Sequence, residues 1–419
     1  MLRHIFINLW NTRRRNIWIM LELVVIAIVC WTVIDPIFVI LYNKSISNGF
    51  ETDGLYRLQL SKVPNGNAGT SEEFYQLMQR LREHKQIESA TYIVGGQYPC
   101  APGRSYGKLR KDTVSVDVAF MTFIPKSDFF KTWRMRSAKD GTWETLEKLE
   151  YPHKSIILTS DAAQHLSPNQ DLWGGVVYNR DSLPMQVAAL AQPVKMRSSK
   201  LPYYLRLTAW TDTLPSQLLN DDVTIFARTK PGVAEVRFIE DFIPWMEEHL
   251  VAGSFFVSKI EPFHKVSELS DLREGATNEI RIKYALCYFF LVNLFLGISG
   301  TFWLNTRTRR EEIGVRLSYG SSPWKIRLML LGEATVMVTV AVLIGCFLYF
   351  QWALQEGFYV LGGVIPSDDS QYITNQFMEH FLVISAIVYA IMLVVTWIGV
   401  WIPAYTISKI SPVMALRDE

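Results

Sequence analysis

Residues that could catalyse a reaction are present in this chain, but none of them has the spacing of a known catalytic motif. Residues 103–108 come nearest to a phosphate-binding loop, yet the glycine spacing is wrong and no Ser or Thr follows the lysine. Glu248 and His249 belong to a polar helix end, not to a zinc-binding HExxH pattern. Cys100 has no histidine near it in sequence, which favours a structural thiol over a nucleophile. We therefore expect no catalytic residue, no cofactor site and no metal site in this chain.

Two carboxylates, Glu22 and Asp35, lie within a long apolar segment. An acid at the centre of a bilayer costs about 2.5 kcal/mol or more, so such residues usually face a partner or water. Glu22 lies near one end of the segment and Asp35, followed by Pro36, near the other, where this cost falls sharply. Proximity to the interfaces accounts for both acids without a function. A pairing or conformational role is the functional alternative, and a proton relay is a weaker one.

The most informative segment is the basic stretch TRTRREEIGVRLSYGSSPWKIRLMLLGEA. Glu312 and Arg316 are four residues apart with the acid first, which is a favourable pair on a helix. Ile313 and Leu317 have the same spacing, so a short helix with an apolar stripe is predicted. Gly320 and the Ser-Ser-Pro after it end this helix, and a second amphipathic helix follows. A plain basic loop would explain the arginines but neither the stripe nor the glycines.

The chain contains four apolar windows, and each is long enough to cross a bilayer, which needs about 20 such residues. They cover residues 17–41, 284–304, 328–350 and 381–401, with nothing comparable between 42 and 283. The formal net charge is only +2, which gives no sign of a nucleic-acid partner. The sequence therefore predicts a polytopic protein of the lipid bilayer with four spanning helices.

The placement of Lys and Arg predicts that both termini are cytoplasmic. Basic residues gather in the segment 1–16 before the first window and in the loop 305–327, whereas the loop 351–380 has none. The segment 42–283 and the loop 351–380 are then external, and the tail 402–419 is cytoplasmic. Apolar residues of segment 1–16 recur at spacings of three and four, which suits an amphipathic helix in the inner interface. A cytosolic extension of the first spanning helix explains them equally well.

The external segment 42–283 has the pattern of a mixed α/β domain. A strand at 55–60, a helix beginning at Ser71 with two acids in its first turn, and a strand at 88–94 follow one another. The same order returns from residue 223 to 260. Two β-α-β units around an insert predict one lobe closed by both chain ends and a second lobe at about 115–215, although chance similarity of two common motifs explains the repeat equally well. Residues 267–283 are predicted to form a helical stalk that continues unbroken into the second span.

The loop 305–327 resembles that of the FtsX/MacB-type permease family of ABC transporters. The family pattern is approximately R-x-R-E-I-G-[VI]-R-x-x-x-G-[AS]-[ST], with a Glu-Ala pair further on. Glu311 is one acid more than this pattern, and residues 410–417 resemble the family's closing x-x-P-x-x-A-L-R. Residues 128–135 and 156–166 resemble segments of the family's external domain. The matching loop residues are Arg310, Glu312, Ile313, Gly314, Val315, Arg316, Gly320, Ser321, Ser322, Glu333 and Ala334.

The resemblance implies a four-span permease subunit of the bacterial cytoplasmic (inner) membrane. It would pair with a second permease subunit, in a homodimer or heterodimer, and bind a separate ABC ATPase that holds ATP and Mg. The resemblance is also compatible with a periplasmic or outer-membrane partner. Family members export peptides or macrolides, extract lipoproteins or control cell-wall hydrolases. No residue in this sequence indicates which of these functions the chain has. The implied ATPase-coupling residues are Arg309, Arg310, Glu311, Glu312, Ile313, Gly314, Arg316, Leu317 and Gly320.

Two functions of other classes compete with this interpretation. A membrane-bound sensor or scaffold, whose external domain binds a ligand or an envelope protein, would carry a cytosolic signalling domain, and residues 402–419 are too few for one. A membrane-anchored hydrolase would need a catalytic constellation, which the sequence lacks.

Overall fold

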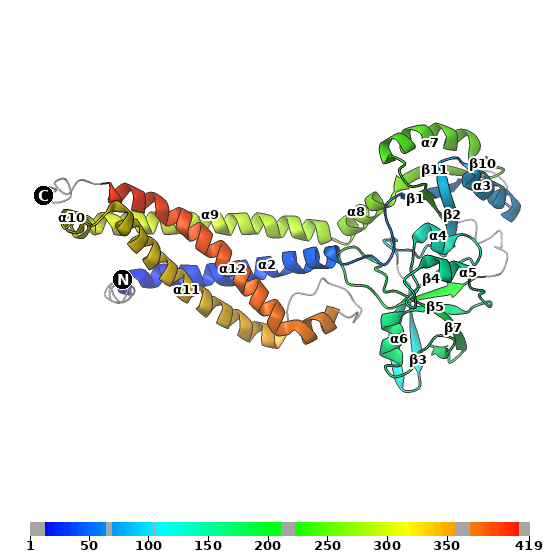
Figure 1. Ribbon diagram of the computed structural model, residues 1–419, viewed down its shortest axis with the longest axis horizontal. Coiled ribbons are helices and arrows are strands. Elements are labelled where there is room, and N and C mark those ends of the chain that lie inside the picture. Colours follow the sequence, from blue (N-terminus) through cyan, green and yellow to red (C-terminus); the bar gives the residue numbers. More distant parts are fainter. Residues whose placement is uncertain (1–12, 64–68, 104, 211–222, 357–368, 410–419) are drawn as a thin grey trace. The chain divides into compact units, whose positions relative to one another are not determined.

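The computed structural model describes residues 13–63, 69–103, 105–210, 223–356 and 369–409 (Figure 1). The chain divides into two compact units. The first, here called the membrane unit, comprises Met1–Leu41, Thr277–Gly362 and Ser370–Glu419. The second, here called the α/β unit, is built mainly from Tyr42–Ala276. The amphipathic segment predicted at residues 2–10 and most of the C-terminal tail lie outside the described residues.

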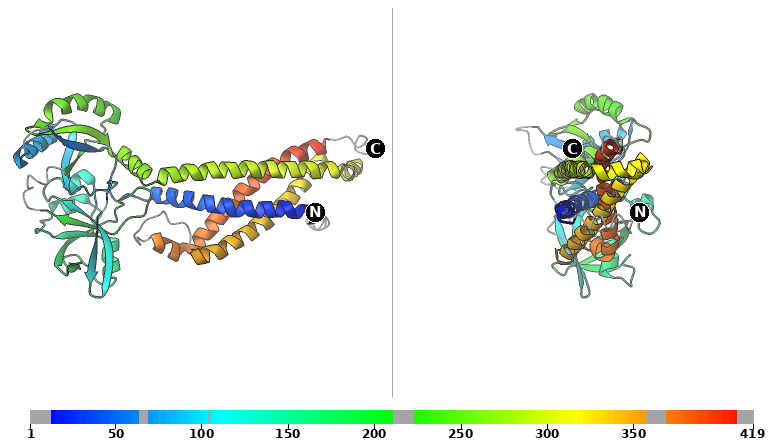
Figure 2. Two further views of the ribbon diagram at one scale, coloured as in Figure 1. Left: turned by 180° about the vertical axis from the view of Figure 1, so that it is seen from behind. Right: turned by 90° about the vertical axis from the view of Figure 1, so that its left-hand side faces the viewer.

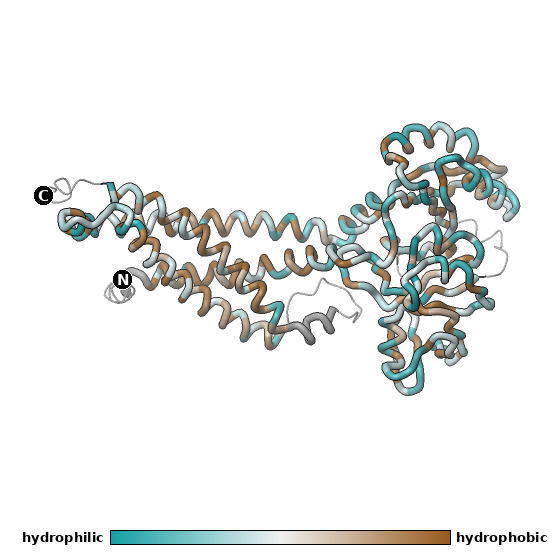
Figure 3. The backbone as a smooth tube through the Cα atoms, in the orientation of Figure 1, coloured by the Kyte–Doolittle hydropathy of each residue, from teal (hydrophilic) through white to brown (hydrophobic). Residues whose placement is uncertain are grey.

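The membrane unit contains four long helices, α2 (Arg13–Ser45), α9 (Ala276–Thr308), α11 (Pro323–Glu356) and α12 (Asp369–Ser408). Each is long and apolar enough to cross a membrane, which confirms the prediction of four spans. Apolar residues dominate all four helices, whereas polar residues are frequent in the α/β unit (Figure 3). Between α9 and α11 lies the short helix α10 (Arg310–Ser318).

Side chains from α2, α9, α11 and α12 form one continuous apolar core. Trp31 of α2, Val338 of α11 and Val388 of α12 are completely buried in it. Helices α11 and α12 run obliquely to α2 and α9 (Figure 2). A small residue permits the close approach of α2 and α11, because a Cβ atom at Gly345 would lie 2.8 Å from the Cβ of Ala27.

The α/β unit begins and ends in one five-stranded antiparallel sheet of order β10-β11-β1-β9-β2. Its strands are β1 (Leu55–Lys62), β2 (Ile87–Val94), β9 (Val223–Thr229), β10 (Val251–Ala252) and β11 (Phe255–Pro262). Helix α3 (Ser71–Glu83) connects β1 to β2, and α7 (Glu235–His249) leads from β9 towards β11. Because β9 lies between β1 and β2, and β1 between β9 and β11, the two β-α-β units interleave as split units of a single sheet.

Alternate residues of this sheet enter two different cores, as the pleat of a strand requires. Ile225 and Ala227 of β9 join the core that contains the buried faces of α3 and α7. Phe226, between them, points to the other face and packs against Trp133, with ring centroids 4.7 Å apart. Trp133 also contacts Phe263 edge to face at 5.3 Å. Both faces of the sheet are therefore covered.

Between β2 and β9 the chain forms a closed six-stranded barrel of order β3-β4-β8-β5-β7-β6. The first strand of the barrel precedes the predicted start of the second lobe at about residue 115. The short helices α4 (Phe129–Trp133), α5 (Trp143–Lys148) and α6 (Ser160–Leu166) also lie in this insert. The barrel strands are β3 (Tyr106–Lys111), β4 (Val114–Phe123), β5 (Ile156–Thr159), β6 (Val176–Asn179), β7 (Pro184–Ala191) and β8 (Leu205–Ala209).

The predicted unbroken stalk is wrong. Helix α8 (Phe263–Arg273) ends three residues before α9 begins at Ala276. Gly275 has a φ of +85°, a left-handed conformation that glycine adopts without steric cost and that commonly ends a helix. Its backbone N–H donates to the carbonyl of Leu272 at 3.2 Å, which closes the last turn of α8. The connection to the second span therefore contains a joint.

Candidate functional site

Helix α10 occupies the middle of the predicted coupling loop. Its first turn carries Glu311 and Glu312 and its last turn Arg316, which suits the positive and negative ends of the helix dipole. The N–H of Gly320 donates to the carbonyl of Leu317 at 3.0 Å, and that of Ser321 to the carbonyl of Arg316 at 3.0 Å. With a φ of +84° at Gly320, these bonds form a Schellman motif that ends the helix.

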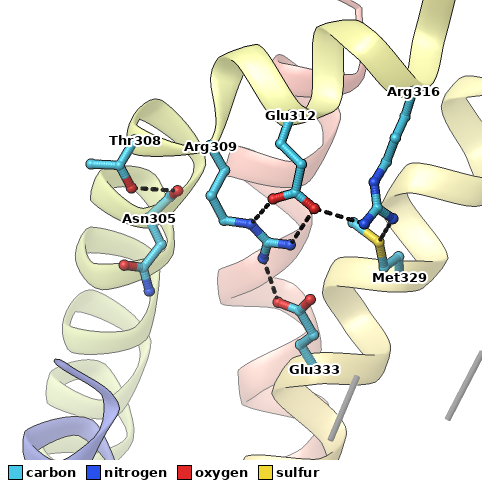
Figure 4. Close-up of polar contacts among 7 residues, drawn as sticks. All are labelled: Asn305, Thr308, Arg309, Glu312, Arg316, Met329 and Glu333. Carbon is cyan, nitrogen blue, oxygen red and sulfur yellow. Dashed lines mark hydrogen bonds and ion pairs between the residues drawn. The ribbon is translucent and has the colours of Figure 1, made fainter. Parts of the chain in front are cut away.

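A network of charged side chains ties α10 to α11 (Figure 4). Arg309, which directly precedes α10, contacts Glu312 Oε2 through Nε at 3.0 Å and Glu333 Oε2 of α11 through Nη1 at 2.8 Å. Glu312 also accepts from Arg316 Nη2 at 2.7 Å. Arg316 in turn reaches the sulfur of Met329 at 2.8 Å. Because Arg309 bridges two carboxylates, its guanidinium joins the short helix to the third span.

The two halves of this network differ in burial. The side chains of Arg309 and Glu333 are 13% and 8% exposed, whereas those of Glu312 and Arg316 are 40% and 43% exposed. Partial burial disfavours the charge on Glu312, but hydrogen bonds and charges from Arg309 and Arg316 outweigh it and lower the pKa of this carboxyl. The Arg309–Glu333 pair is therefore the part whose loss costs most, because removing one partner leaves a buried charge behind.

The apolar stripe of α10 faces inward. Ile313 is 1% exposed, and together with partly buried Leu317 it packs into the core of the membrane unit. Gly314 is also buried. On the opposite side Val315 is 42% exposed and Tyr319 is 88% exposed. The exposed face of α10 is therefore centred on Val315 and Tyr319.

The nine residues proposed for coupling thus divide by position. Polar contacts bring together Arg309, Glu312 and Arg316, and the inner side holds Ile313, Gly314 and Leu317. The other three are Glu311, which is exposed, Arg310, which lines a hollow beside α12, and Gly320, which ends the helix.

The residues expected from the sequence to couple to an ATPase did not include Val315 or Tyr319, which form the exposed face of α10, or Glu333, which pairs with Arg309. Val315 and Tyr319 are four apart, a spacing that puts them on one helix face and could have identified them. The role of Glu333 as the partner of Arg309 carried no comparable signal, because it lies beyond the loop on α11.

The two intramembrane acids have different surroundings. Asp35 is fully buried, and its Oδ1 lies 2.7 Å from Nε2 of His380, which is 1% exposed. Trp31, one turn before Asp35, stacks on Tyr349 with centroids 4.2 Å apart. Glu22 is exposed and lies against α9, where a Cβ at Gly297 would come within 2.4 Å of its Oε1. His380 escaped the sequence reasoning because it falls at the end of a loop predicted to be external.

Within the α/β unit, residues 195 and 197 contact the two segments through which the chain enters and leaves the unit. Lys195 donates through Nζ to the carbonyl of Asn43, in the last turn of α2, and to that of Ile46, just after α2, the latter at 2.6 Å. Arg197 forms an ion pair with Glu274 at 2.7 Å, at the end of α8. Burial lowers the pKa of Lys195 to about 8, although the charge of Asp271 opposes this shift. The start and the end of the unit are thus held by neighbouring residues of the barrel insert.

No group of three or more His, Cys, Asp or Glu side chains that could hold a metal ion occurs among the described residues. The four cysteines, at positions 30, 100, 287 and 346, are free thiols.

Comparison with protein families identifies residues 284–412 as a match to the FtsX-like permease C-terminal family. This region contains the second, third and fourth spans and the whole of α10. No curated protein sequence matches the chain.

Three solved structures of external domains resemble the chain weakly. The periplasmic region of MacB from Actinobacillus actinomycetemcomitans is 11% identical, with a TM-score of 0.33, covering 53% of this chain and 94% of its own. The extracellular domain of the noncanonic ABC-type transporter YknZ from Gram-positive bacteria is 10% identical, with a TM-score of 0.30, covering 49% and 100%. A domain of a putative permease from Porphyromonas gingivalis is 14% identical, with a TM-score of 0.34, covering 53% and 98%. Since identity and TM-score are low, the functional argument rests on the family match.

Proposed function

Residues 284–412 form an FtsX-like permease C-terminal region, and on this premise we propose that the chain is the transmembrane subunit of an ABC transporter. A separate ATPase would bind ATP and Mg and would dock on α10. The permease would act as a dimer, with a second copy or a related chain. Its α/β unit would perform the mechanical work outside the cytoplasm, whether that work is export, lipoprotein extraction or control of an envelope process.

The observation that carries this proposal is the construction of α10. A short helix is clamped to its own membrane unit by an apolar inner face and a buried ion pair, while an aromatic side chain stands 88% exposed on the outside. Tyrosine at the centre of an interface is a frequent energetic hot spot. A rigidly mounted helix with an exposed Tyr319 suits a contact that has to transmit force.

The helix connections supply the path for that force. Helix α9 ends at Thr308 and α10 begins at Arg310, so a displacement of α10 acts directly on the second span. Arg309 passes the same displacement to α11 through Glu333. With the basic segments in the cytoplasm, α10 would lie on the side where ATP is available and the α/β unit on the other.

The test is reconstitution with an ABC ATPase from the same organism, sought first in the reading frames that adjoin the gene of this chain. The two proteins should co-purify, and the permease in proteoliposomes should stimulate ATP hydrolysis. Tyr319→Ala should weaken this association about 30-fold or more, because loss of a hot-spot tyrosine costs roughly 2 kcal/mol. Tyr75→Ala is the matched control, because Tyr75 is a 40% exposed tyrosine of the α/β unit.

Membrane insertion and thermal stability of the Tyr319 variant should match the parent chain, since the side chain makes little contact with its own unit. Unchanged association and stimulation in that variant, at normal levels of inserted protein, would contradict docking on α10. Failure of the parent chain to stimulate any ATPase would count against the transporter function itself.

A further inference from the structure

Aromatic and basic side chains gather where α11 begins and α12 ends. Trp324 of α11 contacts Trp401 of α12 edge to face, with ring centroids 5.9 Å apart. Arg327 of α11 lies over the ring of Tyr405 of α12, with its guanidinium carbon 4.5 Å from the ring centroid. Both helices belong to the membrane unit, so these contacts are made within one compact body. The group is here called the α11/α12 cluster and comprises Trp324, Arg327, Trp401, Tyr405, Ser408 and Lys409.

Contacts with α12 restrict the orientation of the Arg327 guanidinium. Its Nε donates to the hydroxyl of Ser408 at 2.8 Å, and that hydroxyl donates to the carbonyl of Tyr405 at 2.9 Å. The guanidinium carbon also lies 5.9 Å from the centroid of the Trp401 ring. The two Nη groups of Arg327 form no hydrogen bond with any described residue. They remain as a pair of donors, which is the geometry that binds two oxygens of one phosphate.

A second cation meets the same aromatic ring. Nζ of Lys409 lies 4.4 Å from the centroid of the Tyr405 ring, which Arg327 also contacts. Neither cation forms an ion pair with an acidic side chain in the described part of the chain. Arg309, in contrast, is balanced by Glu312 and by an acid of α11. Because like charges that share one ring repel, an anion bound by both would stabilise the arrangement.

The surroundings of the cluster are those of a membrane interface. Helices α11 and α12 are long and apolar enough to span a bilayer, and tryptophan and tyrosine are enriched where spans reach the headgroups. The indole N–H groups of Trp324 and Trp401 form no hydrogen bond with a described residue, so they can donate to lipid oxygens. Val394 and Ile398 are exposed seven and three residues before Trp401, so they share its face of α12. An acyl chain can follow this face from the cluster into the bilayer.

The charges of the cluster favour an anionic lipid over a zwitterionic one. Two cations are present, and the cluster contains no acidic side chain to balance the ammonium group of a zwitterionic headgroup. With the basic segments in the cytoplasm, this end of the spans would face the inner leaflet, where basic sites between helices suit anionic headgroups. We propose that the α11/α12 cluster binds the phosphate headgroup of an anionic phospholipid, with Arg327 and Lys409 as its ligands.

A lipid bound there would join the start of the third span to the end of the fourth. Arg327 belongs to α11, whereas Lys409 directly follows α12, so one phosphate bound by both connects the two helices. The binding does not depend on the transporter function. It needs only that this end of the membrane unit lies in a leaflet that contains anionic lipid.

The experiment measures lipid binding by the full-length chain purified in detergent. Native mass spectrometry would count phosphatidylglycerol retained per chain, with phosphatidylcholine of the same acyl length as the zwitterionic comparison. We expect selective retention of phosphatidylglycerol by the parent chain. In the Arg327→Gln, Lys409→Gln double variant its affinity should fall about 30-fold, as expected for two basic contacts at a membrane surface. Lys325→Gln is the matched control, since Lys325 is an exposed cation beside Trp324 that contacts none of the cluster's rings.

Lys409→Gln alone should lower the affinity about fivefold. Lys409 follows the last residue of α12, so this variant keeps the test decisive if the change at Arg327 disturbs the packing of the helices. Equal retention of phosphatidylglycerol by the parent and by both variants would overturn the proposal. So would an equal loss in the Lys325 control, because the effect would then reflect general surface charge.

Inorganic phosphate at millimolar concentration is the second probe, and it distinguishes the two sources of a phosphate group. We expect it to compete poorly with phosphatidylglycerol, because it has no acyl chain to bury. If it binds in a Lys409-dependent way while phosphatidylglycerol shows no preference over phosphatidylcholine, the cluster takes a soluble phosphate and the lipid assignment is wrong.

Discussion

Replacing Arg309 by methionine is expected to loosen α10 from α11. The substitution keeps a long side chain that can fill similar space, but it removes the charge that bridges Glu312 and Glu333. Glu312 is 40% exposed and keeps its bond to Arg316, so water and that arginine compensate it. Glu333 is 8% exposed and lies in a spanning helix, so its carboxylate is left without the arginine that faces it. The cost therefore arises mainly at Glu333.

The exposed fractions of these side chains determine how much free energy each substitution costs. Removing one partner of a buried ion pair typically costs about 3 to 5 kcal/mol, and we expect the lower end because the Glu333 side chain is 8% exposed and not completely buried. The exposed pair of Glu312 and Arg316 should contribute at most about 0.5 kcal/mol. A local opening that is easier by about 3 kcal/mol corresponds to about a 100-fold increase in its equilibrium constant. Arg316→Met should therefore change the opening of α10 less than about threefold.

Hydrogen exchange in the purified chain is the direct assay, because it reports the local opening of a helix residue by residue. The amides of residues 314–318 should exchange about 100-fold faster in Arg309→Met and nearly unchanged in Arg316→Met. The double variant Arg309→Met, Glu333→Leu removes both buried charges and should recover most of the protection. Equal effects of the two arginine variants, or a double variant less protected than Arg309→Met alone, would refute the assignment of the buried pair as the clamp.

Three other changes test separate features. Burial lowers the pKa of Lys195 from 10.5 to about 8, so the unfolded chain binds more protons than the folded chain between these pH values. As the pH rises through this range, the folded parent should therefore gain up to about 3 kcal/mol of stability relative to Lys195→Met. A difference in thermal midpoint between the parent and Lys195→Met that is the same at pH 7.5 and pH 10 would contradict this pH dependence. Gly320→Ala should speed exchange in α10 about fivefold, since alanine at a φ of +84° costs about 1 kcal/mol, whereas Gly300→Ala, in open space on α9, should have little effect. Asp35→Leu and His380→Leu should each lower the thermal midpoint of the purified chain, and the double variant should be more stable than either; a double loss equal to the sum of the two would exclude a coupled pair.

Features set by local sequence were predictable. Each span is a continuous apolar run, and α10 follows from charged and apolar pairs four residues apart. The start of α3 was predicted at Ser71, but the capping residue is Thr70. Its hydroxyl accepts from the N–H of Glu73 at 3.2 Å, while the Glu73 carboxylate accepts from the N–H of Thr70 at 3.1 Å. The capping-box pattern of Thr and Glu three apart was present in the sequence, one residue earlier than the position considered.

Features set by distant contacts were not predictable from one sequence. Asp35 and His380 are 345 positions apart, and nothing near either residue specifies the other. The direction of the α10 stripe depends on the core against which it packs, so the exposed face could not be assigned. The break before α9 is a different case, because a basic residue in the last turn, Arg273, followed by Gly275 just past the helix end is a recognised stop signal. The apolar spacing that continued across it led to the wrong prediction of one unbroken helix.

The pairing of β1 with β11 determines how the α/β unit can be loaded. Tyr56, at the start of β1, pairs with Pro262, at the end of β11, so both connections to the spans leave the same end of one antiparallel ladder. A tension applied equally to both connections draws the two strands in the same direction and leaves the hydrogen bonds between them unstrained. A displacement of one connection relative to the other shears this ladder along its whole length. The unit is therefore stiff towards a shared pull and sensitive to a differential one, which makes the relative sliding of the first two spans the motion that it would register.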